Sequence, residues 1–141
     1  FLKWQKFSQT TPEFPIGNIV NAGCVRELNP EEINAYDAPF PSDEYKAGAR
    51  IFPTLVPTRE EDPASKDNAD AWVALSEFTK PFLLAFSDSD RITKGGDAVF
   101  RAKVPGTSKQ NHVTIQSAGH FLQEDKGPEL AELINDFIAN T

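Results

Sequence analysis

One histidine and two aspartates have the types and spacing that general acid–base chemistry uses. His120 lies in the stretch QSAGHFLQED, and Asp88 and Asp90 lie about thirty residues earlier in LLAFSDSDRIT. A carboxylate that accepts a hydrogen bond from one imidazole nitrogen leaves the other nitrogen free to act as a base. An aspartate and a histidine that meet in the fold would therefore form a general base with its orienting acid. The spacing leaves open which aspartate is the partner.

Two apolar runs predict the strands that would bring these residues together. PFLLAF at 81–86 is continuously apolar, as in a strand buried on both faces of a parallel sheet, although a buried helix fits the same pattern. HVTIQSAG at 112–119 is a second, β-branched run. Helical patterns lie between the runs, at 95–104, and after them, at 127–140. The order strand, helix, strand, helix predicts parallel strands with a right-handed crossover.

The carboxyl ends of these strands are where the chemistry is expected, because functional groups of open α/β sheets collect in the crevice beyond those ends. Asp88 and Asp90 follow the first run and His120 follows the second. His112 opens the second run, so we expect it to be structural. Structural alternatives remain for the others: a lone histidine is more often a packing or surface residue, and Asp88 could simply hold its own turn.

The last helical pattern is the strongest in the chain. Pro128 suits its first turn, where the missing N–H is not needed. Five large apolar residues recur at i, i+3, i+4, i+7 and i+8 and predict one buried face. They are Leu130, Leu133, Ile134, Phe137 and Ile138.

The first half of the chain carries most of the prolines and no alternating strand pattern, which predicts short helices joined by proline-rich loops. One helix start is well marked. Asn29 suits the N-cap, Pro30 the first helical position and Glu32 the reciprocal place in a capping box, so a helix is expected over about 30–36. DEYKAGARIF and DNADAWVALSEF are further helix candidates.

Composition excludes several classes of protein. The 141 residues carry 21 acidic and 14 basic side chains, a net charge of −7, so no basic surface is expected for nucleic acid or an anionic membrane. No apolar run approaches the ~20 residues that cross a bilayer, so we expect a soluble, cytoplasmic protein. The single cysteine, Cys24, allows no disulfide within the chain, and no metal site or cofactor is predicted. The chain begins at Phe1 and contains no methionine, from which we expect a fragment of a longer protein.

Four stretches of the sequence resemble haloalkane dehalogenases of the α/β-hydrolase superfamily. They are AGHFLQED, FSDSDRIT, AYDAPFPSDEYKAGARIFPTLVP and the opening FLKWQKF. The resemblance spans nearly the whole chain and is strongest to the subfamily whose cap supplies a tryptophan to the halide site. It implies a C-terminal fragment of the α/β-hydrolase fold: a helical cap over 1–77, and the last two parallel strands with their helices over 78–141.

The resemblance also implies a role for individual residues. His120 would be the general base and Asp90, the later of the two aspartates, its acid partner. Trp4 would donate its indole N–H to the departing halide, although core packing is the alternative for a tryptophan. The residues that would line the substrate pocket, each of which could equally be ordinary core, are Phe1, Phe52, Pro53, Val56, Ile92 and Phe121.

The implied reaction hydrolyses a small halogenated alkane with water to an alcohol and a halide ion, through an alkyl-enzyme ester. The nucleophilic aspartate and a second halide-binding tryptophan would come from the missing N-terminal part of the same enzyme. An epoxide hydrolase is one alternative, for which Tyr36 and Tyr45 are the only candidate tyrosines. Another α/β-hydrolase or a non-catalytic binding module of the same fold is a further alternative.

Overall fold

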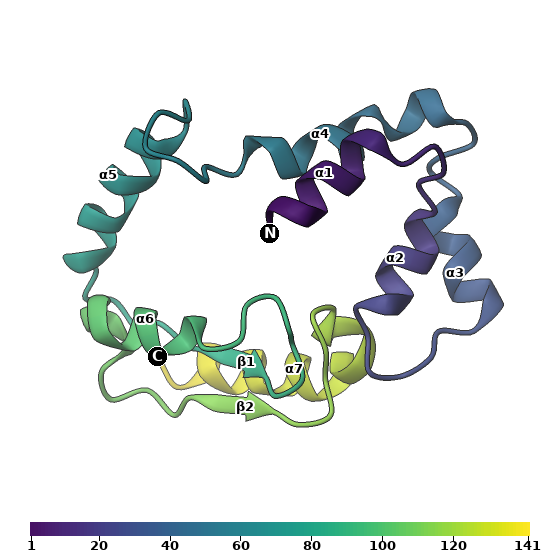
Figure 1. The fold of residues 1–141 in the computed structure, drawn as a ribbon. Coiled ribbons are helices and arrows are strands. Elements are labelled where there is room, and N and C mark those ends of the chain that lie inside the picture. Colours follow the sequence, from purple (N-terminus) through teal and green to yellow (C-terminus); the bar gives the residue numbers. More distant parts are fainter. The chain divides into compact units, whose positions relative to one another are not determined.

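The computed structural model describes all residues, 1–141, and divides them into two compact units. The first unit comprises residues 1–20 and 28–72, and the second comprises residues 21–27 and 73–141. Figure 1 shows the elements along the chain, in which helices predominate and the only sheet is small. Segment 21–27 therefore belongs, in space, with the C-terminal half of the sequence.

Helices joined by short loops make up the first unit, as the sequence predicts. In chain order the elements are α1 (Leu2–Thr10), α2 (Ile16–Ala22), α3 (Pro30–Asp37), the 3-10 turn η1 (Asp43–Lys46), α4 (Ala47–Leu55) and α5 (Ser65–Ser76). The last two residues of α2 and the last four of α5 belong to the second unit.

The start of α3 confirms the predicted capping box. The Asn29 side chain accepts a hydrogen bond from the Glu32 N–H at 2.9 Å, and the Glu32 carboxylate accepts one from the Asn29 N–H at 2.8 Å. Pro30 occupies the first turn, where its missing N–H is not needed. Two N–H groups that a helix start leaves without partners are thereby satisfied.

Polar side chains join α1 to α4. The Gln5 amide donates to the Pro53 carbonyl at 2.8 Å. From α4, the Arg50 guanidinium donates to the Ser8 carbonyl at 3.1 Å and to the Thr11 carbonyl at 2.9 Å. Because the last carbonyls of a helix have no partner within it, Arg50 stabilises the C-terminal end of α1.

The sheet of the second unit has two short parallel strands, β1 (Ala85–Ser87) and β2 (Val113–Ile115), paired in register from Ala85 with Val113 to Ser87 with Ile115. The parallel order is confirmed, and the alternative of a buried helix at 81–86 is wrong. The ladder is shorter than the apolar run because the Phe82 N–H donates to the Gly106 carbonyl, outside β2, at 3.0 Å.

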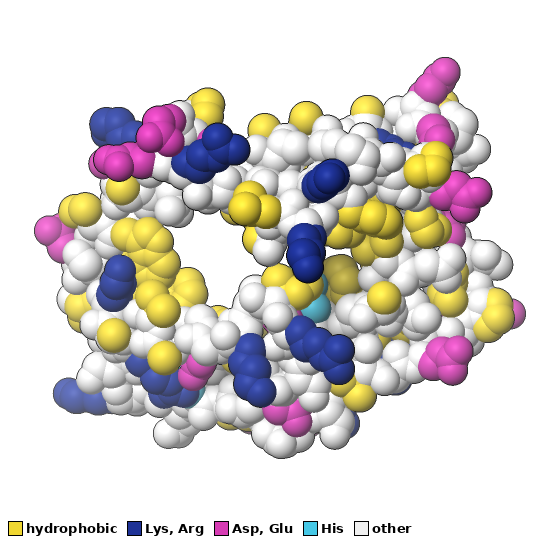
Figure 2. Space-filling model, in the orientation of Figure 1, with side chains coloured by type: hydrophobic (Ala, Val, Ile, Leu, Met, Phe, Trp, Pro, Cys, Tyr) yellow, Lys and Arg dark blue, Asp and Glu magenta, His cyan; other side chains and the backbone are white.

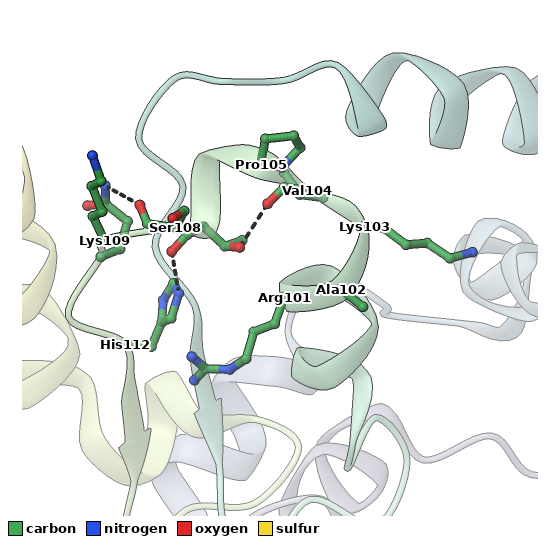
Figure 3. Close-up of a pocket in the computed structure, with 10 residues that line it drawn as sticks. Arg101, Ala102, Lys103, Val104, Pro105, Ser108, Lys109 and His112 are labelled. Carbon is green, nitrogen blue, oxygen red and sulfur yellow. Dashed lines mark hydrogen bonds between the residues drawn. The ribbon is translucent and has the colours of Figure 1, made fainter.

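His112 is structural, as its place at the start of β2 predicts. Its Nδ1 accepts from the Leu84 N–H at 3.0 Å, so Nε2 carries the proton and donates to the Thr107 carbonyl at 2.9 Å. A hollow of about 420 Å³ lies beside this histidine. Figure 3 shows the residues around it. The hollow is lined by Arg101, Ala102, Lys103, Val104, Pro105, Thr107, Ser108, Lys109, Gln110 and His112. Lys103 and Lys109 extend away from each other in this view, so their charges do not converge.

Two helices complete the second unit, α6 (Gly96–Lys103) and α7 (Leu122–Ala139), with the 3-10 turn η2 (Pro105–Thr107) after α6. α7 packs against β2 and has a break at Lys126, where φ is −140° and ψ is 38°. Pro128 accounts for the break, because it has no N–H to donate to the carbonyl of the residue four positions earlier and its ring would clash with that carbonyl. The helix expected over 127–140 is confirmed after this break, and the turn before it, at 122–125, was not predicted.

Large apolar side chains remain exposed on several helices. On α4, Phe52 is 69% exposed, and on α5, Val73 is 63% exposed. Figure 2 shows apolar side chains among other atoms at the surface over both helices. On α7, Ile138 is 67% exposed and no residue is fully buried, so the predicted apolar face is only partly covered. None of the helices has the length and apolar composition needed to span a membrane.

Candidate active site

Asp90 and His120 meet at the carboxyl ends of the two strands, each in the loop that follows its strand. The His120 Nδ1 lies 3.1 Å from the Asp90 Oδ2. The predicted hydrogen bond between these residues is therefore present. The Asp90 side chain is 6% exposed and the His120 side chain 33%, so the carboxylate is enclosed while the imidazole reaches solvent.

Asp90 is held in its charged form. Burial by itself would raise the pKa of the carboxyl group, but hydrogen bonds from the Thr93 hydroxyl and the Ile92 N–H, the second at 2.7 Å, act in the opposite direction. Together with the His120 bond they lower the pKa of Asp90 to about 2. An ionised carboxylate only accepts hydrogen bonds, so the proton of this pair sits on the histidine Nδ1. The His120 Nε2 makes no hydrogen bond within the chain and presents a free lone pair.

Asp88 serves the neighbouring loop instead. Its carboxylate accepts from the Ser117 N–H at 3.0 Å and the Ala118 N–H at 3.3 Å, both in the loop after β2. The bond from Ser117 is the main cause of the lowered pKa of Asp88. Asp88 also accepts from the hydroxyl of the adjacent Ser89 at 3.0 Å, so the alternative of a turn role holds in part. Its two bonds to the loop that precedes His120 were not predicted, and they are possible because the two strands lie side by side.

The loop that carries His120 depends on close backbone packing. Ser117 has a positive φ of 54°, which turns the chain sharply after β2. A Cβ atom on Gly119 would lie 2.3 Å from the Gly23 carbonyl oxygen. This clash is with a backbone atom, which cannot move aside as the end of a flexible side chain could. The Ser87 hydroxyl also donates to the Gly119 carbonyl at 2.7 Å. Only glycine fits at 119, so the residue before the histidine is fixed by packing.

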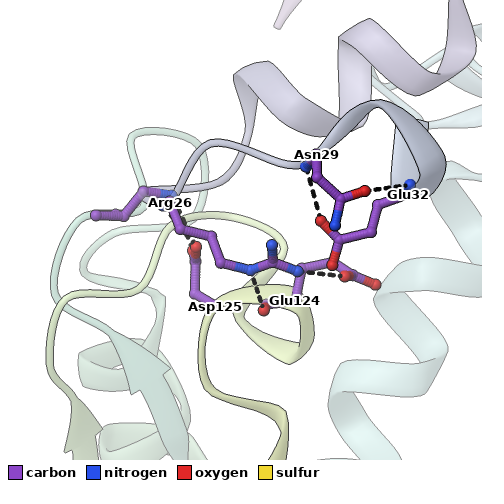
Figure 4. Close-up of polar contacts among 6 residues, drawn as sticks. Arg26, Asn29, Glu32, Glu124 and Asp125 are labelled. Carbon is purple, nitrogen blue, oxygen red and sulfur yellow. Dashed lines mark hydrogen bonds and ion pairs between the residues drawn. The ribbon is translucent and has the colours of Figure 1, made fainter.

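Segment 21–27 forms the other support of this loop. The His120 N–H donates to the Gly23 carbonyl at 2.7 Å, and the Asp125 carboxylate accepts from the Val25 and Arg26 N–H groups. Figure 4 shows the Arg26 side chain over the start of α7. The sequence does not predict the role of this segment, because nothing in the pattern of residues 21–27 points to a partner a hundred positions away.

Two of the expected pocket residues belong to the second unit with the pair. The Phe121 ring lies edge-on to the His120 ring, with 5.1 Å between centroids and 72° between planes. Ile92 is 65% exposed and contributes its N–H to Asp90. Their contact with a substrate stays a prediction.

The other expected site residues belong to the first unit. Trp4 in α1 is half-buried and stacks on Phe7 and Phe14, with 5.7 and 5.9 Å between ring centroids. These are the packing contacts of the structural alternative, and the role of Trp4 toward a halide stays a prediction. The first unit also holds the four remaining pocket candidates, of which Pro53 is buried and the others exposed: Phe1, Phe52, Pro53 and Val56.

No group of three or more His, Cys, Asp or Glu residues is arranged to hold a metal ion. The hollow of Figure 3 lies at the amino end of β2, whereas His120 follows the carboxyl end, so the hollow is separate from the Asp90–His120 pair. What the pair can do by itself is take a proton from a bound water or hydroxyl group, with Asp90 stabilising the imidazolium.

Comparisons with known proteins lead to one family. No family model matches the chain. The chain is 51% identical over 138 residues to a haloalkane dehalogenase of Psychrobacter cryohalolentis, a match that covers 98% of the chain and 46% of the relative. It is 46% identical over 134 residues to a haloalkane dehalogenase of Mycolicibacterium paratuberculosis, covering 95% and 44%. The chain thus spans less than half the length of these relatives.

Solved structures agree with the sequence relatives. Haloalkane dehalogenase DpaA of Paraglaciecola agarilytica superimposes with a TM-score of 0.82 at 30% identity, over 94% of this chain and 44% of that one. Haloalkane dehalogenase DbeA of Bradyrhizobium elkani superimposes with a TM-score of 0.72 at 25% identity, over 99% and 52%. The resemblance to haloalkane dehalogenases and the partial α/β-hydrolase fold are confirmed.

Proposed function

We propose that this chain is part of a haloalkane dehalogenase in which His120 is the general base and Asp90 its acid partner. One observation carries the proposal: a buried, ionised carboxylate accepts the Nδ1 proton of a histidine whose Nε2 is free. The relatives supply the reaction class, since they are named as haloalkane dehalogenases. Because the chain spans less than half of their length, the rest of the machinery is assigned to sequence outside these 141 residues.

The first step needs a nucleophile from that other sequence. The carboxylate of an aspartate attacks the halogen-bearing carbon of a small haloalkane and forms a new carbon–oxygen bond. The carbon–halogen bond breaks, and its electron pair leaves with the halide. Since this carboxylate is already ionised at neutral pH, His120 takes no part in the step.

His120 acts in the second step, the hydrolysis of the alkyl-enzyme ester. Its Nε2 takes a proton from a water molecule while the water oxygen attacks the ester carbonyl. The negative charge of Asp90, held by three hydrogen bonds, stabilises the imidazolium that forms and keeps the ring in the required tautomer. The alcohol is released, the nucleophile is regenerated, and the proton passes to solvent.

The remaining residues are assigned by resemblance. Residues 1–77 would be the cap and residues 78–141 the C-terminal part of the core. The indole N–H of Trp4 would bind the departing halide, replacing a hydrogen bond from water. The apolar pocket for the haloalkane would be lined by Phe1, Phe52, Pro53, Val56, Ile92 and Phe121. Epoxide hydrolysis and a non-catalytic role are not favoured, because the relatives are named as dehalogenases.

The two-step mechanism is tested with His120→Ala in the full-length protein that contains this chain, with 1-bromobutane as substrate. Wild type should release bromide through many turnovers. The variant should release about one bromide per protein molecule and then stop, because the base is needed only for ester hydrolysis. Intact-mass measurement should find one butyl group on the stalled protein.

Asp97→Asn is the matched control, because Asp97 lies on α6 and pairs only with the side chain of Arg101, at 3.5 Å. This variant should turn over at the wild-type rate. A wild-type protein that releases no bromide would overturn the proposed reaction. Steady turnover by His120→Ala would overturn the role of the histidine.

A further inference from the structure

Four successive backbone N–H groups, from Ser117 to His120, donate to acceptors outside their own loop. Asp88 accepts the first two, as described above. The Asp125 carboxylate accepts the Gly119 N–H at 2.7 Å, and the Gly23 carbonyl accepts the His120 N–H at 2.7 Å. The position of the histidine backbone is therefore set by these acceptors and not by the loop itself.

The Asp125 carboxylate joins the loop that carries His120 to segment 21–27, because it accepts hydrogen bonds from both. Besides the Gly119 N–H, its carboxylate accepts hydrogen bonds from two further backbone N–H groups. The Val25 nitrogen lies 3.0 Å from Oδ1 and 2.9 Å from Oδ2, and the Arg26 nitrogen lies 2.9 Å from Oδ1. The same segment contains Gly23, whose carbonyl holds His120. One side chain thus binds the histidine loop directly and also binds the segment that supports it.

Arg26 and Glu124 strengthen this arrangement (Figure 4). The Arg26 Nε donates to the Glu124 carbonyl at 2.8 Å, and its Nη2 lies 3.2 Å from the Glu124 carboxylate. Burial by itself would raise the pKa of Asp125, but the N–H groups of Gly119, Val25 and Arg26 lower it. Asp125 is therefore ionised at neutral pH and accepts through both oxygens, which an asparagine with one oxygen cannot do.

We propose that Asp125 is a positioning residue for His120: it fixes the backbone from which the imidazole reaches Asp90, without touching the substrate itself. The His120–Asp90 bond, at 3.1 Å, is already near the long end of the usual range. A shift of the loop by a few tenths of an ångström would weaken it and misdirect Nε2. The inference rests on the proposed function, because only ester hydrolysis uses His120.

The test is Asp125→Asn in the full-length protein, compared with Asp97→Asn, with 1-bromobutane as substrate. The first bromide should leave at the wild-type rate and with wild-type amplitude, because alkylation does not need the histidine. Steady-state turnover should fall roughly 10- to 100-fold, the usual cost of a misplaced catalytic group, and butylated protein should accumulate. If the rate of the first bromide release and the steady-state rate fall in proportion, Asp125 has no positioning role. The same holds if neither rate changes.

Asp125→Glu keeps the charge but displaces its oxygens by one methylene, and it provides a second variant if the asparagine protein is unstable. Its burst should also be complete and its hydrolysis slowed, by less than in Asp125→Asn. Equal slowing in both variants would contradict a requirement for two charged acceptor oxygens.

A measurement without substrate separates this inference from the proposed function. Amide hydrogen exchange at Gly119 and His120 should be faster in Asp125→Asn than in wild type and unchanged in Asp97→Asn. Should wild type release no bromide, the reaction is wrong, while the exchange rates still decide whether Asp125 holds the loop. Unaltered exchange at both amides would overturn the inference.

Discussion

Asp88 and Asp90 are two positions apart and bind different partners. Asp88 binds two backbone N–H groups of the neighbouring loop, whereas Asp90 binds the imidazole of His120 and donors of its own turn. Spacing alone left both aspartates open as partners of the histidine, and only the family resemblance selected the later one. Local sequence does not reveal which way a loop carboxylate points, because that depends on the strand beside it.

The lowered pKa of Asp90 has a consequence for acid stability. A carboxyl group with a pKa of about 2 in the folded protein, against 3.8 ordinarily, adds stability that is complete above pH 3.8 and lost as the pH falls toward 2. The shift corresponds to roughly 2 kcal/mol. The stability difference between full-length wild type and Asp90→Asn should therefore shrink as the pH falls from about 4 toward 2.

Urea unfolding of both proteins at a series of pH values measures this difference. Since asparagine at position 90 cannot ionise, the pH dependence of the difference below about pH 4, outside the range in which imidazoles ordinarily titrate, isolates this carboxylate. A difference that already declines between pH 6 and 5 would mean that Asp90 is protonated far more readily than its hydrogen bonds imply.

Element types were predictable from the sequence because they follow from local rules. The capping residues at 29–32 and the apolar period of α7 each act within a few positions. The length of β1 was not predictable, because it depends on where β2 and the Gly106 carbonyl lie. The first turn of α7 was missed because it is only four residues long, and yet it carries Asp125.

Helix α1 allows the role of Trp4 to be separated from its packing. Trp4→Phe in the full-length protein should keep the ring stack on Phe7 and Phe14 while removing the indole N–H. Chloride affinity, followed by fluorescence titration, should fall roughly 10-fold or more, as expected for loss of a hydrogen bond to an ion. Carbon–halogen cleavage should slow as well.

The matched control is Trp72→Phe, since Trp72 is the second tryptophan and lies on α5. This variant should bind chloride as wild type does. Unchanged chloride binding by Trp4→Phe would leave Trp4 with a packing role alone.

The whole chain has little of the architecture that an independent α/β protein needs. Its sheet has two strands of three residues, whereas three or more strands or a covering layer are usually required for stability. Large apolar side chains stay exposed on several helices, among them Phe52, Val73 and Ile138. We therefore expect the 141 residues, expressed alone, to form no stable monomer and to release no halide from haloalkanes.

Size-exclusion chromatography and calorimetry of the 141-residue chain check this expectation. A monodisperse monomer with a cooperative thermal transition would refute the expected instability. Halide release above the rate in buffer, abolished by His120→Ala, would refute the expected lack of activity.

The supports of His120 come from opposite ends of the sequence, and this has a kinetic consequence. The partners of Asp125 at Val25 and Arg26 are 100 and 99 positions away from it. Contacts across so long a loop form late, because the entropy of closing the loop is lost before any bond compensates for it. During synthesis, Gly23 leaves the ribosome long before the residues that it must bind. We therefore expect the loop that carries the base of the proposed reaction to reach its final position late in folding.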